Sequence, residues 1–162
     1  MSKIIDFYLK IKPNCDGHTL DNILSWSNDE LEHSHDVIQW LFPTTKESNF
    51  NPDAPILTKK DIHLWKANPQ LQSNLKESFE RFLTFLGMEY KEDKLIVTDK
   101  KQNVWSGLNH NWLRVTRVLN CLNLLGLKQE AKCLFECLEN MYKSKEYQIT
   151  DEVFSYWKKA AE

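Results

Sequence analysis

Apolar residues that recur every three or four positions are the feature that most constrains the fold of this chain. The clearest series comprises Trp105, Leu108, Trp112, Val115, Leu119 and Leu122. Because an α-helix has about 3.6 residues per turn, this spacing places the apolar side chains on one face. Gly126 follows the series, at a position where a left-handed residue commonly ends a helix. The sequence therefore predicts an amphipathic helix over residues 105–126 with one buried face.

The same period continues on both sides of this segment. One series, which begins after Pro69 and ends at Gly87, comprises Leu71, Leu75, Phe79, Phe82 and Leu86. Another follows the 105–126 helix at once, predicts an αα-hairpin with it, and comprises Ala131, Leu134, Phe135, Leu138 and Met141. Shorter helices are expected over residues 19–26, 58–67 and 150–160, and residues 3–11 form either a short helix or an extended lead-in.

Strand-like alternation is almost missing, and the chain holds only four glycines. The charged segment 88–103 contains the run LIVT, which is either a lone short strand or part of a loop. We therefore predict an all-α fold, a single compact multi-helix domain of about six to eight helices over residues 1–162. We expect helices 29–42 and 105–126 to form its central packed pair.

Length and charge restrict the classes of protein that this chain can represent. Its 162 residues suffice for one domain with a hydrophobic core. A net charge of −2 creates no general attraction for nucleic acid, so we do not expect a nucleic-acid partner. No apolar run approaches the roughly 18 residues that cross a bilayer, and the first residues lack the features of a signal peptide. We expect no transmembrane segment, no secretion, and a cytoplasmic location, or a nucleocytoplasmic one in a eukaryote.

The cysteine pattern gives no sign of a zinc site. The four cysteines are Cys15, Cys121, Cys133 and Cys137, and none forms a C-x-x-C pair. Cys133 and Cys137 share one side of a predicted helix and could hold a metal, but such cysteines are more often small core residues. Reduced thiols suit a cytosolic protein. We predict that the chain uses no metal and no cofactor.

Residues 31–43, LEHSHDVIQWLFP, concentrate groups that can carry chemistry. Ser27 and Glu30 fit a capping box, which predicts a helix that starts near residue 29 and continues to Phe42. On a helical wheel this segment has three stripes, which are Leu31, His35, Ile38 and Phe42, then Glu32, Asp36 and Gln39, then His33 and Trp40.

The wheel excludes one site and leaves another open. His33 and His35 point in different directions, so one metal cannot bind both, in contrast to the H-E-x-x-H arrangement. His35 lies among apolar neighbours and is either a core histidine or a buried ligand-binding or acid–base group.

Residues 108–119, LNHNWLRVTRVL, place His110, Arg114 and Arg117 on one side of the strongest predicted helix. These donors have two interpretations. They form an anion site for a phosphate or a ligand carboxylate, with a neighbouring tryptophan as an aromatic wall. Alternatively, the two arginines make interhelical salt bridges to an acidic residue of the 29–42 helix, which would be Glu32 or Asp36.

Residues 43–57, PTTKESNFNPDAPIL, have three prolines and no helical period. Long loops in compact domains are often functional, and aromatic residues are enriched at recognition surfaces. We therefore predict a binding groove walled by this loop, Trp40 and Trp112, in which an arginine meets a ligand carboxylate. The candidate ligand-binding residues are Glu32, His35, Asp36, Gln39, Trp40, His110, Trp112, Arg114 and Arg117. The sequence nominates no catalytic residue.

These segments resemble the opioid growth factor receptor family. LEHSHDVIQWLFP is similar to the family pattern LEHxHxYIQWLFP, and HNWLRVTRVL is similar to HNYLRITRIL. Val37 and Trp112 stand where the family usually has tyrosine. Matching residues of the lead-in are Phe7, Tyr8, Asp16, Gly17, Ile23, Leu24 and Trp26. The resemblance implies a conserved helical domain, which in animals belongs to a nucleus-associated, growth-inhibiting receptor for the peptide Met-enkephalin, and it implies no catalytic residue.

Three functions remain as hypotheses. The first is a non-enzymatic module that binds a peptide or a protein partner. The second is a metal-dependent phosphohydrolase of the HD type, because His35 and Asp36 form a His-Asp dipeptide and further histidines are present at His18, His63 and His110. The third is an anion-binding or nucleic-acid-binding domain that uses the face of Arg114. The resemblance and the aromatic content favour the first.

Overall fold

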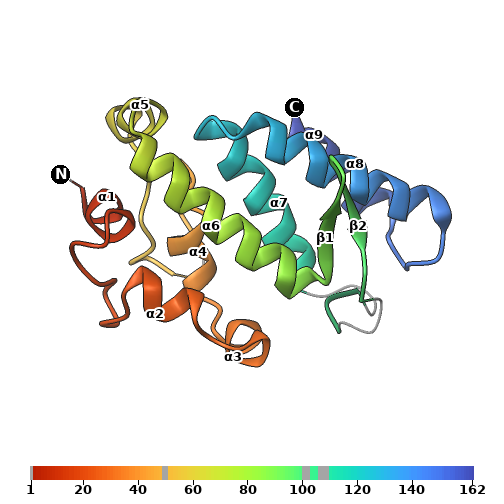
Figure 1. The fold of residues 1–162 in the computed structure, drawn as a ribbon, viewed down its shortest axis with the longest axis horizontal. Helices are drawn as coiled ribbons and strands as arrows, with labels where there is room; N and C mark the ends of the chain where they lie inside the picture. Colours follow the sequence, from red (N-terminus) through yellow and green to blue (C-terminus); the bar gives the residue numbers. More distant parts are fainter. Residues whose placement is uncertain (1, 49–50, 100–102, 106–109) are drawn as a thin grey trace. The chain divides into compact units, whose positions relative to one another are not determined.

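A computed structural model describes residues 2–48, 51–99, 103–105 and 110–162 (Figure 1). The chain divides into two compact units. Unit 1 consists of Met1–Arg81 and Leu124–Gly126, and unit 2 consists of Phe82–Asn123 and Leu127–Glu162. The expectation of a single domain over residues 1–162 remains a prediction.

Unit 1 is built from helices. They are α1 (Lys3–Tyr8), α2 (Leu20–Leu24), α3 (Asn28–His33), α4 (Val37–Leu41), α5 (Lys59–Ala67) and α6 (Pro69–Leu86), the last of which belongs to unit 1 as far as Arg81. Polar side chains stabilise the helix starts as the sequence predicts. The hydroxyl of Ser27 accepts from the backbone N–H of Glu30 at 3.1 Å, and the Glu30 carboxylate accepts from the N–H of Ser27 at 3.2 Å. Thr58 and Asp61 form the same reciprocal capping box at α5.

Tyr8 connects three helices in the core of unit 1. Its hydroxyl donates to the Leu41 carbonyl at the end of α4 and shares a hydrogen bond of 2.8 Å with Ser78 Oγ on α6. Asn74 Nδ2, also on α6, donates to the Tyr8 carbonyl at 2.7 Å. These buried hydrogen bonds fix α1 against α4 and α6, since breaking any of them would leave a polar group unsatisfied in the interior.

The predicted continuous helix over residues 29–42 is wrong, because residues 34–36 separate α3 from α4. Ser34 leaves the helical region, with φ −103° and ψ 87°, and Asp36 precedes α4. Short polar side chains such as those of serine and aspartate hydrogen-bond to nearby backbone and so compete with helix continuation. The break also changes the predicted apolar stripe. Its aliphatic and aromatic members are buried, but His35 is exposed, so it is not a core histidine.

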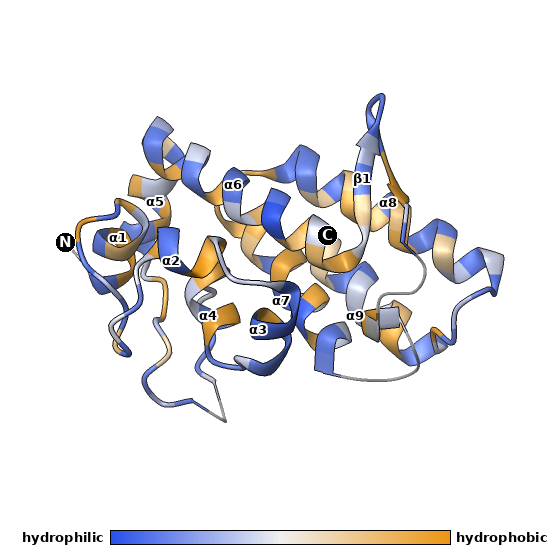
Figure 2. Ribbon diagram, turned by 60° about the horizontal axis from the view of Figure 1, so that its bottom comes forward, coloured by the Kyte–Doolittle hydropathy of each residue, from blue (hydrophilic) through white to orange (hydrophobic). Residues whose placement is uncertain are grey.

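Unit 2 combines helices with a small sheet. After the last turn of α6 come β1 (Met88–Lys91), β2 (Lys94–Val97), the 3₁₀ helix η1 (Asn103–Trp105), α7 (His110–Leu124, in unit 2 as far as Asn123), α8 (Lys128–Ser144) and α9 (Asp151–Ala161). Figure 2 shows both hydrophobic and hydrophilic residues within α6 and α7, as expected of helices with one buried face. No helix among the described residues is long and apolar enough to span a membrane.

The hairpin of β1 and β2 corrects the all-α prediction to a mostly helical fold. The strands are antiparallel, with Met88 opposite Val97 and Lys91 opposite Lys94. Glu92 sits in the intervening turn with φ 58°, which a two-residue hairpin turn requires. β2 packs against α8, and Leu95 is buried there. The run LIVT therefore forms a strand because a partner strand and a helix are available to cover it, which its own composition does not reveal.

The strongest predicted helix begins later than expected. α7 starts at His110, whereas Trp105 belongs to η1 and Leu108 lies outside the described residues. Gly126 has φ 95° after the end of α7, in agreement with its predicted role as a helix terminator. The predicted packing of this helix against residues 29–42 remains a prediction, because the two segments belong to different units.

Candidate functional site

Unit 1 contains a pocket of about 620 Å³. Its lining comes from separate parts of the chain, namely Lys3 and Asp6 of α1, residues 12–15, Trp40 of α4, and residues 52–55. The volume falls in the range of roughly 300–1,000 Å³ that is usual for small-ligand sites. The lining combines one tryptophan, several prolines and charged side chains of both signs.

Gln39 holds one wall of this pocket in place. Its Nε2 donates to Ser48 Oγ at 2.8 Å, and its Oε1 accepts from Asn51 Nδ2 at 2.8 Å. Asn51 Oδ1 in turn accepts from the backbone N–H of Asp53 at 3.1 Å, directly within the lining segment. The structure thus gives Gln39, a predicted ligand-binding residue, hydrogen-bond partners in the proline-containing loop.

Asn14 forms a second wall. Its Oδ1 accepts two backbone hydrogen bonds, from Asp16 at 3.1 Å and from His18 at 2.9 Å, which fold the turn that ends with Gly17 at φ 83°. Asn14 is only 6% exposed. Its amide nitrogen, in contrast, donates no hydrogen bond to any described residue. The oxygen of this side chain therefore builds the turn, while two N–H donors remain available.

Trp40 lines the pocket, and its indole group is buried. The side chain is 3% exposed and packs edge-on against Phe7, with ring centroids 5.2 Å apart. Its indole Nε1 is buried and has no hydrogen-bond acceptor within the described part of the chain. The other buried tryptophans each donate an indole hydrogen bond to a backbone carbonyl. The pairs are Trp65 with Leu71 at 3.2 Å, Trp105 with Leu86 at 2.7 Å, Trp112 with Val104 at 3.1 Å and Trp157 with Trp112 at 3.1 Å.

Charged groups surround the mouth of the pocket. Lys12 Nζ lies 3.7 Å from Asp6 Oδ2, whereas Lys3 makes no ion pair with any residue of the described segments. Cys15 is also in the lining. Its partial burial, together with the nearby carboxylates of Asp16 and Asp53, raises the pKa of its thiol, so the neutral thiol prevails near pH 7.

Unit 2 has a pocket of its own, with a volume of about 550 Å³. The lining residues are His110, Trp112, Leu113 and Thr116 of α7, and Thr150, Glu152, Val153 and Tyr156 at the start of α9. Two of its apolar members are well exposed, Leu113 at 68% and Tyr156 at 50%. The predicted groove contained both Trp40 and Trp112, and the structure places them in separate pockets, one in each unit.

Of the two predicted arginines, Arg114 is buried and Arg117 is half-buried. Arg114 is 6% exposed, and its guanidinium carbon lies 5.9 Å from the ring centroid of Phe85, which is a cation–π geometry. Burial lowers the pKa of Arg117, and the adjacent Cys121 acts against this shift. Neither arginine lines either pocket described above. Their predicted pairing with Glu32 or Asp36 remains a prediction, because those acids belong to unit 1.

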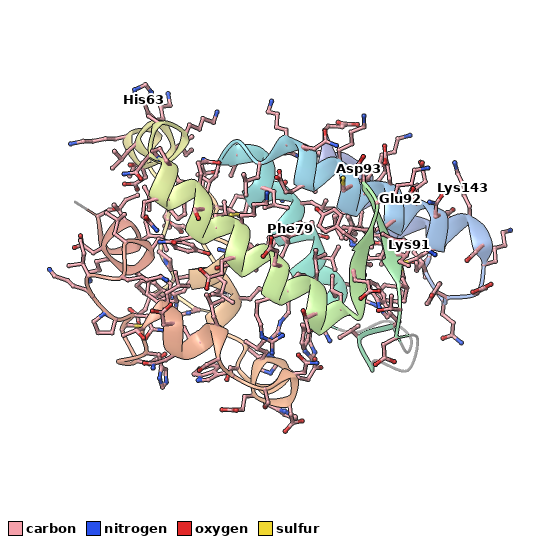
Figure 3. All side chains as sticks on the ribbon, in the orientation of Figure 1. His63, Phe79, Lys91, Glu92, Asp93 and Lys143 are labelled. Atoms are coloured by element: carbon pink, nitrogen blue, oxygen red, sulfur yellow. The ribbon has the colours of Figure 1, made fainter. Side chains whose placement is uncertain are left out.

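The histidines do not gather into a metal site within the described residues, which contain no group of three or more His, Cys, Asp or Glu side chains able to hold an ion. His35 and Asp36 are exposed in the break between α3 and α4, and Glu32 is half-buried on α3. His63 lies on the exposed side of α5 (Figure 3). The described geometry therefore gives the phosphohydrolase hypothesis no support.

Comparison with known proteins identifies the family. A family model described as the opioid growth factor receptor conserved region matches residues 2–162. The chain belongs to the opioid growth factor receptor family.

Relatives in this family extend well beyond the matched region. The opioid growth factor receptor of Homo sapiens is 33% identical over 136 residues, which are 76% of this chain and 20% of that protein. The opioid growth factor receptor of Mus musculus is 34% identical over 126 residues, or 72% of this chain and 19% of that protein. The opioid growth factor receptor-like protein 1 of Xenopus tropicalis is 35% identical over 129 residues, or 74% of this chain and 25% of that protein. This chain thus spans a quarter or less of these relatives. No solved structure matches it significantly.

In this member of the opioid growth factor receptor family, the sequence found some residues of the unit 1 pocket and missed others. Trp40 was predicted from the 31–43 motif, and the loop over residues 43–57 was predicted as a wall. Lys3, Asp6 and Asn14 were missed, because they join the pocket only through the folding of α1 and the turn that follows it. Asp16-Gly17 is a dipeptide typical of turns, but nothing in the sequence indicates that this turn meets the distant proline loop.

Proposed function

We propose that this opioid growth factor receptor domain is a non-enzymatic binding module that takes a short peptide segment into the unit 1 pocket. The observation that carries the proposal is the construction of that pocket. α1, the turn at residues 12–15, Trp40 and the 52–55 segment all contribute to a single cavity of about 620 Å³. A cavity of this size holds a few amino-acid residues, in keeping with the usual size of small-ligand pockets.

The chemistry of the lining favours a peptide over a purely apolar ligand. Trp40 and the prolines provide flat apolar surface, whereas Lys3 and Lys12 provide positive charge and Asp6 and Asp53 negative charge. A short peptide carries an ammonium and a carboxylate at its two ends and apolar or amide groups between them. The relatives are named opioid growth factor receptor or opioid growth factor receptor-like protein, and these names agree with a ligand-binding role.

The test is affinity selection followed by titration. The domain is incubated with Met-enkephalin and with a pool of random pentapeptides that have free C-termini, and the retained peptides are identified by mass spectrometry. The tightest peptide is then titrated by calorimetry. We expect saturable binding with a stoichiometry of one. If the domain retains no peptide from either source, the proposed function is wrong.

A filled pocket provides the structural control. Ala54 is half-buried in the lining, so Ala54→Phe should occupy part of the cavity and weaken peptide binding at least tenfold. Ala161→Phe makes the same change at a half-buried position at the end of α9, in unit 2, and should leave binding unchanged. Far-UV circular dichroism checks that both variants fold. If a folded Ala54→Phe variant binds the peptide as tightly as the parent chain, the peptide does not occupy this pocket.

A further inference from the structure

We propose that the unit 1 pocket recognises a carboxylate, supplied by the C-terminus of the bound peptide, through the indole N–H of Trp40, the amide of Asn14 and the ammonium of Lys3. This inference rests on the proposed peptide-binding function and makes its ligand chemistry specific. The donors of these three side chains have no acceptor among the described residues of unit 1.

The indole of Trp40 provides the first observation. A buried N–H without an acceptor costs about 1–3 kcal/mol, and folded proteins rarely tolerate such a group without a reason. Four other buried tryptophans in the described segments each donate their indole N–H to a backbone carbonyl, so buried indole groups of this protein ordinarily have an acceptor. Trp40 alone among these buried tryptophans lacks an acceptor, and it lines a pocket large enough to admit one.

Asn14 provides the second, independent observation. Asn14 is buried, with only 6% of its surface exposed, and its side-chain oxygen accepts hydrogen bonds from two backbone N–H groups. The orientation of the amide is therefore fixed, and its nitrogen keeps its two donors for a ligand. Asn14 and Trp40 come from different parts of the sequence, yet both line the same cavity. The indole N–H of Trp40 is buried without an acceptor, and the amide nitrogen of Asn14 donates to no described residue.

Lys3 supplies the charge that distinguishes a carboxylate from a neutral carbonyl. It lies in the lining and forms no ion pair within the described residues, whereas Lys12 is already close to Asp6. Hydrogen bonds from a cation to a carboxylate are roughly twice as strong as neutral ones. A carboxylate has two oxygens and about four acceptor sites, which is enough for an indole, an amide and an ammonium together.

The indole nitrogen of Trp40 is covered by protein atoms and exposes essentially no surface to solvent. A ligand oxygen can therefore meet it only when a lining side chain moves aside. Binding must then change the surroundings of Trp40, which gives the inference a spectroscopic consequence. Capture of a peptide C-terminus by converging N–H donors is a recurrent mode of peptide recognition.

The first experiment compares two forms of one peptide. The tightest peptide from the selection is titrated as its free acid and as its C-terminal amide, which keeps every side chain but removes the negative charge. We expect amidation to weaken binding at least tenfold. Equal affinities would overturn this inference while leaving the proposed function intact, and binding of neither form would count against the proposed function itself.

A third peptide separates the two possible sources of the carboxylate. It ends in an amidated glutamate, so that its only carboxylate is on a side chain. We expect it to bind as weakly as the plain amide. Full recovery of affinity by the glutamate peptide would show that the pocket takes a side-chain carboxylate and would overturn the assignment to the C-terminus.

Matched variants of the domain complete the test. Asn14→Asp keeps the oxygen that builds the turn and replaces the donor by a negative oxygen, so the preference for the free acid should disappear. Asn22→Asp is the control, because Asn22 Oδ1 also accepts from a backbone N–H, that of Thr19 at 3.2 Å, but lies outside the pocket. It should keep the preference. An unchanged preference in a folded Asn14→Asp variant would overturn the role of Asn14.

If Asn14→Asp does not fold, as judged by circular dichroism, a substitution that removes the positive charge of Lys3 provides the test. Lys3→Gln should reduce the free-acid preference at least fivefold, whereas Lys60→Gln, an exposed position on α5, should not change it. Retention of the full preference in Lys3→Gln would overturn the inference.

Discussion

Replacing Trp40 by phenylalanine should destabilise the protein much less than the same change at Trp65. Both tryptophans are buried in unit 1, at 3% and 0% exposure, so both substitutions remove the same ring volume from a packed core and leave cavities of similar size. They differ in the indole N–H. Trp65 donates to the Leu71 carbonyl at 3.2 Å, whereas the N–H of Trp40 has no acceptor in the described segments.

The magnitude follows from this difference. Trp65→Phe loses a hydrogen bond with a net contribution of about 0.5–1.5 kcal/mol. Trp40→Phe removes an unsatisfied donor whose burial costs about 1–3 kcal/mol, so that part of the cavity penalty is offset. The free energy of unfolding should therefore fall by about 1.5–4.5 kcal/mol more for Trp65→Phe than for Trp40→Phe.

Urea unfolding measures both variants under identical conditions. Far-UV circular dichroism is the appropriate signal, because the substitutions alter tryptophan fluorescence directly. The slope of the free energy against urea concentration must remain the same in both variants for the comparison to hold. Equal losses, or a larger loss for Trp40→Phe, would mean that the indole N–H of Trp40 does have a partner in the folded protein, and the argument for a ligand acceptor would fail.

Three further predictions concern other parts of the structure. Gln39→Leu should remove the two hydrogen bonds of 2.8 Å that Gln39 makes to Ser48 and Asn51. It should therefore raise the susceptibility of residues 51–53 to proteolysis and weaken peptide binding, and unchanged cleavage would exclude this anchoring role. Leu119→Ala should cost about 2–5 kcal/mol, because the side chain is fully buried on α7, and a loss below about 0.5 kcal/mol would show that this face is not in the core. Burial and the nearby carboxylates raise the pKa of Cys15, so the rate of its alkylation, measured in a variant whose other cysteines are serine, should rise at higher pH in the folded protein than in urea; coinciding profiles would contradict this.

The sequence predicted those parts of the fold that depend on local patterns. The stripe on α6, including Leu71 and Phe79, is buried as its period indicates, and α6 ends before Gly87 at φ 71°. The capping box predicted at Ser27 is present because its hydrogen bonds join residues three apart. Features that act within one turn of a helix are readable in this way, since they need no knowledge of distant contacts.

The errors arose where local and long-range effects compete. A helical wheel assumes a continuous helix, and the polar residues at 34–36 interrupt it, so His35 became exposed in place of buried. The hairpin was missed because LIVT needs both β1 and α8 to become a strand.

The pocket shows the same limit. The motif identifies Trp40 as a candidate ligand-binding residue. Whether its indole N–H has an acceptor depends on the residues that surround it in the folded protein, which the sequence does not reveal. The sequence analysis did not single out Asn14, and only the folded turn shows that its oxygen accepts two hydrogen bonds while its nitrogen donates none to a described residue.

The most direct measurement of the central claim is nuclear magnetic resonance of the tryptophan indole groups. The chain has six tryptophans, so a protein labelled with ¹⁵N gives a small set of indole signals, and Trp40→Phe identifies the one that belongs to Trp40. On addition of the selected peptide as its free acid, that signal should move strongly to higher proton frequency as a hydrogen bond to the carboxylate forms, while the signal of Trp65 stays in place. The amidated peptide at the same occupancy should move it much less. Saturable binding of the free acid without any displacement of the Trp40 signal would contradict the account.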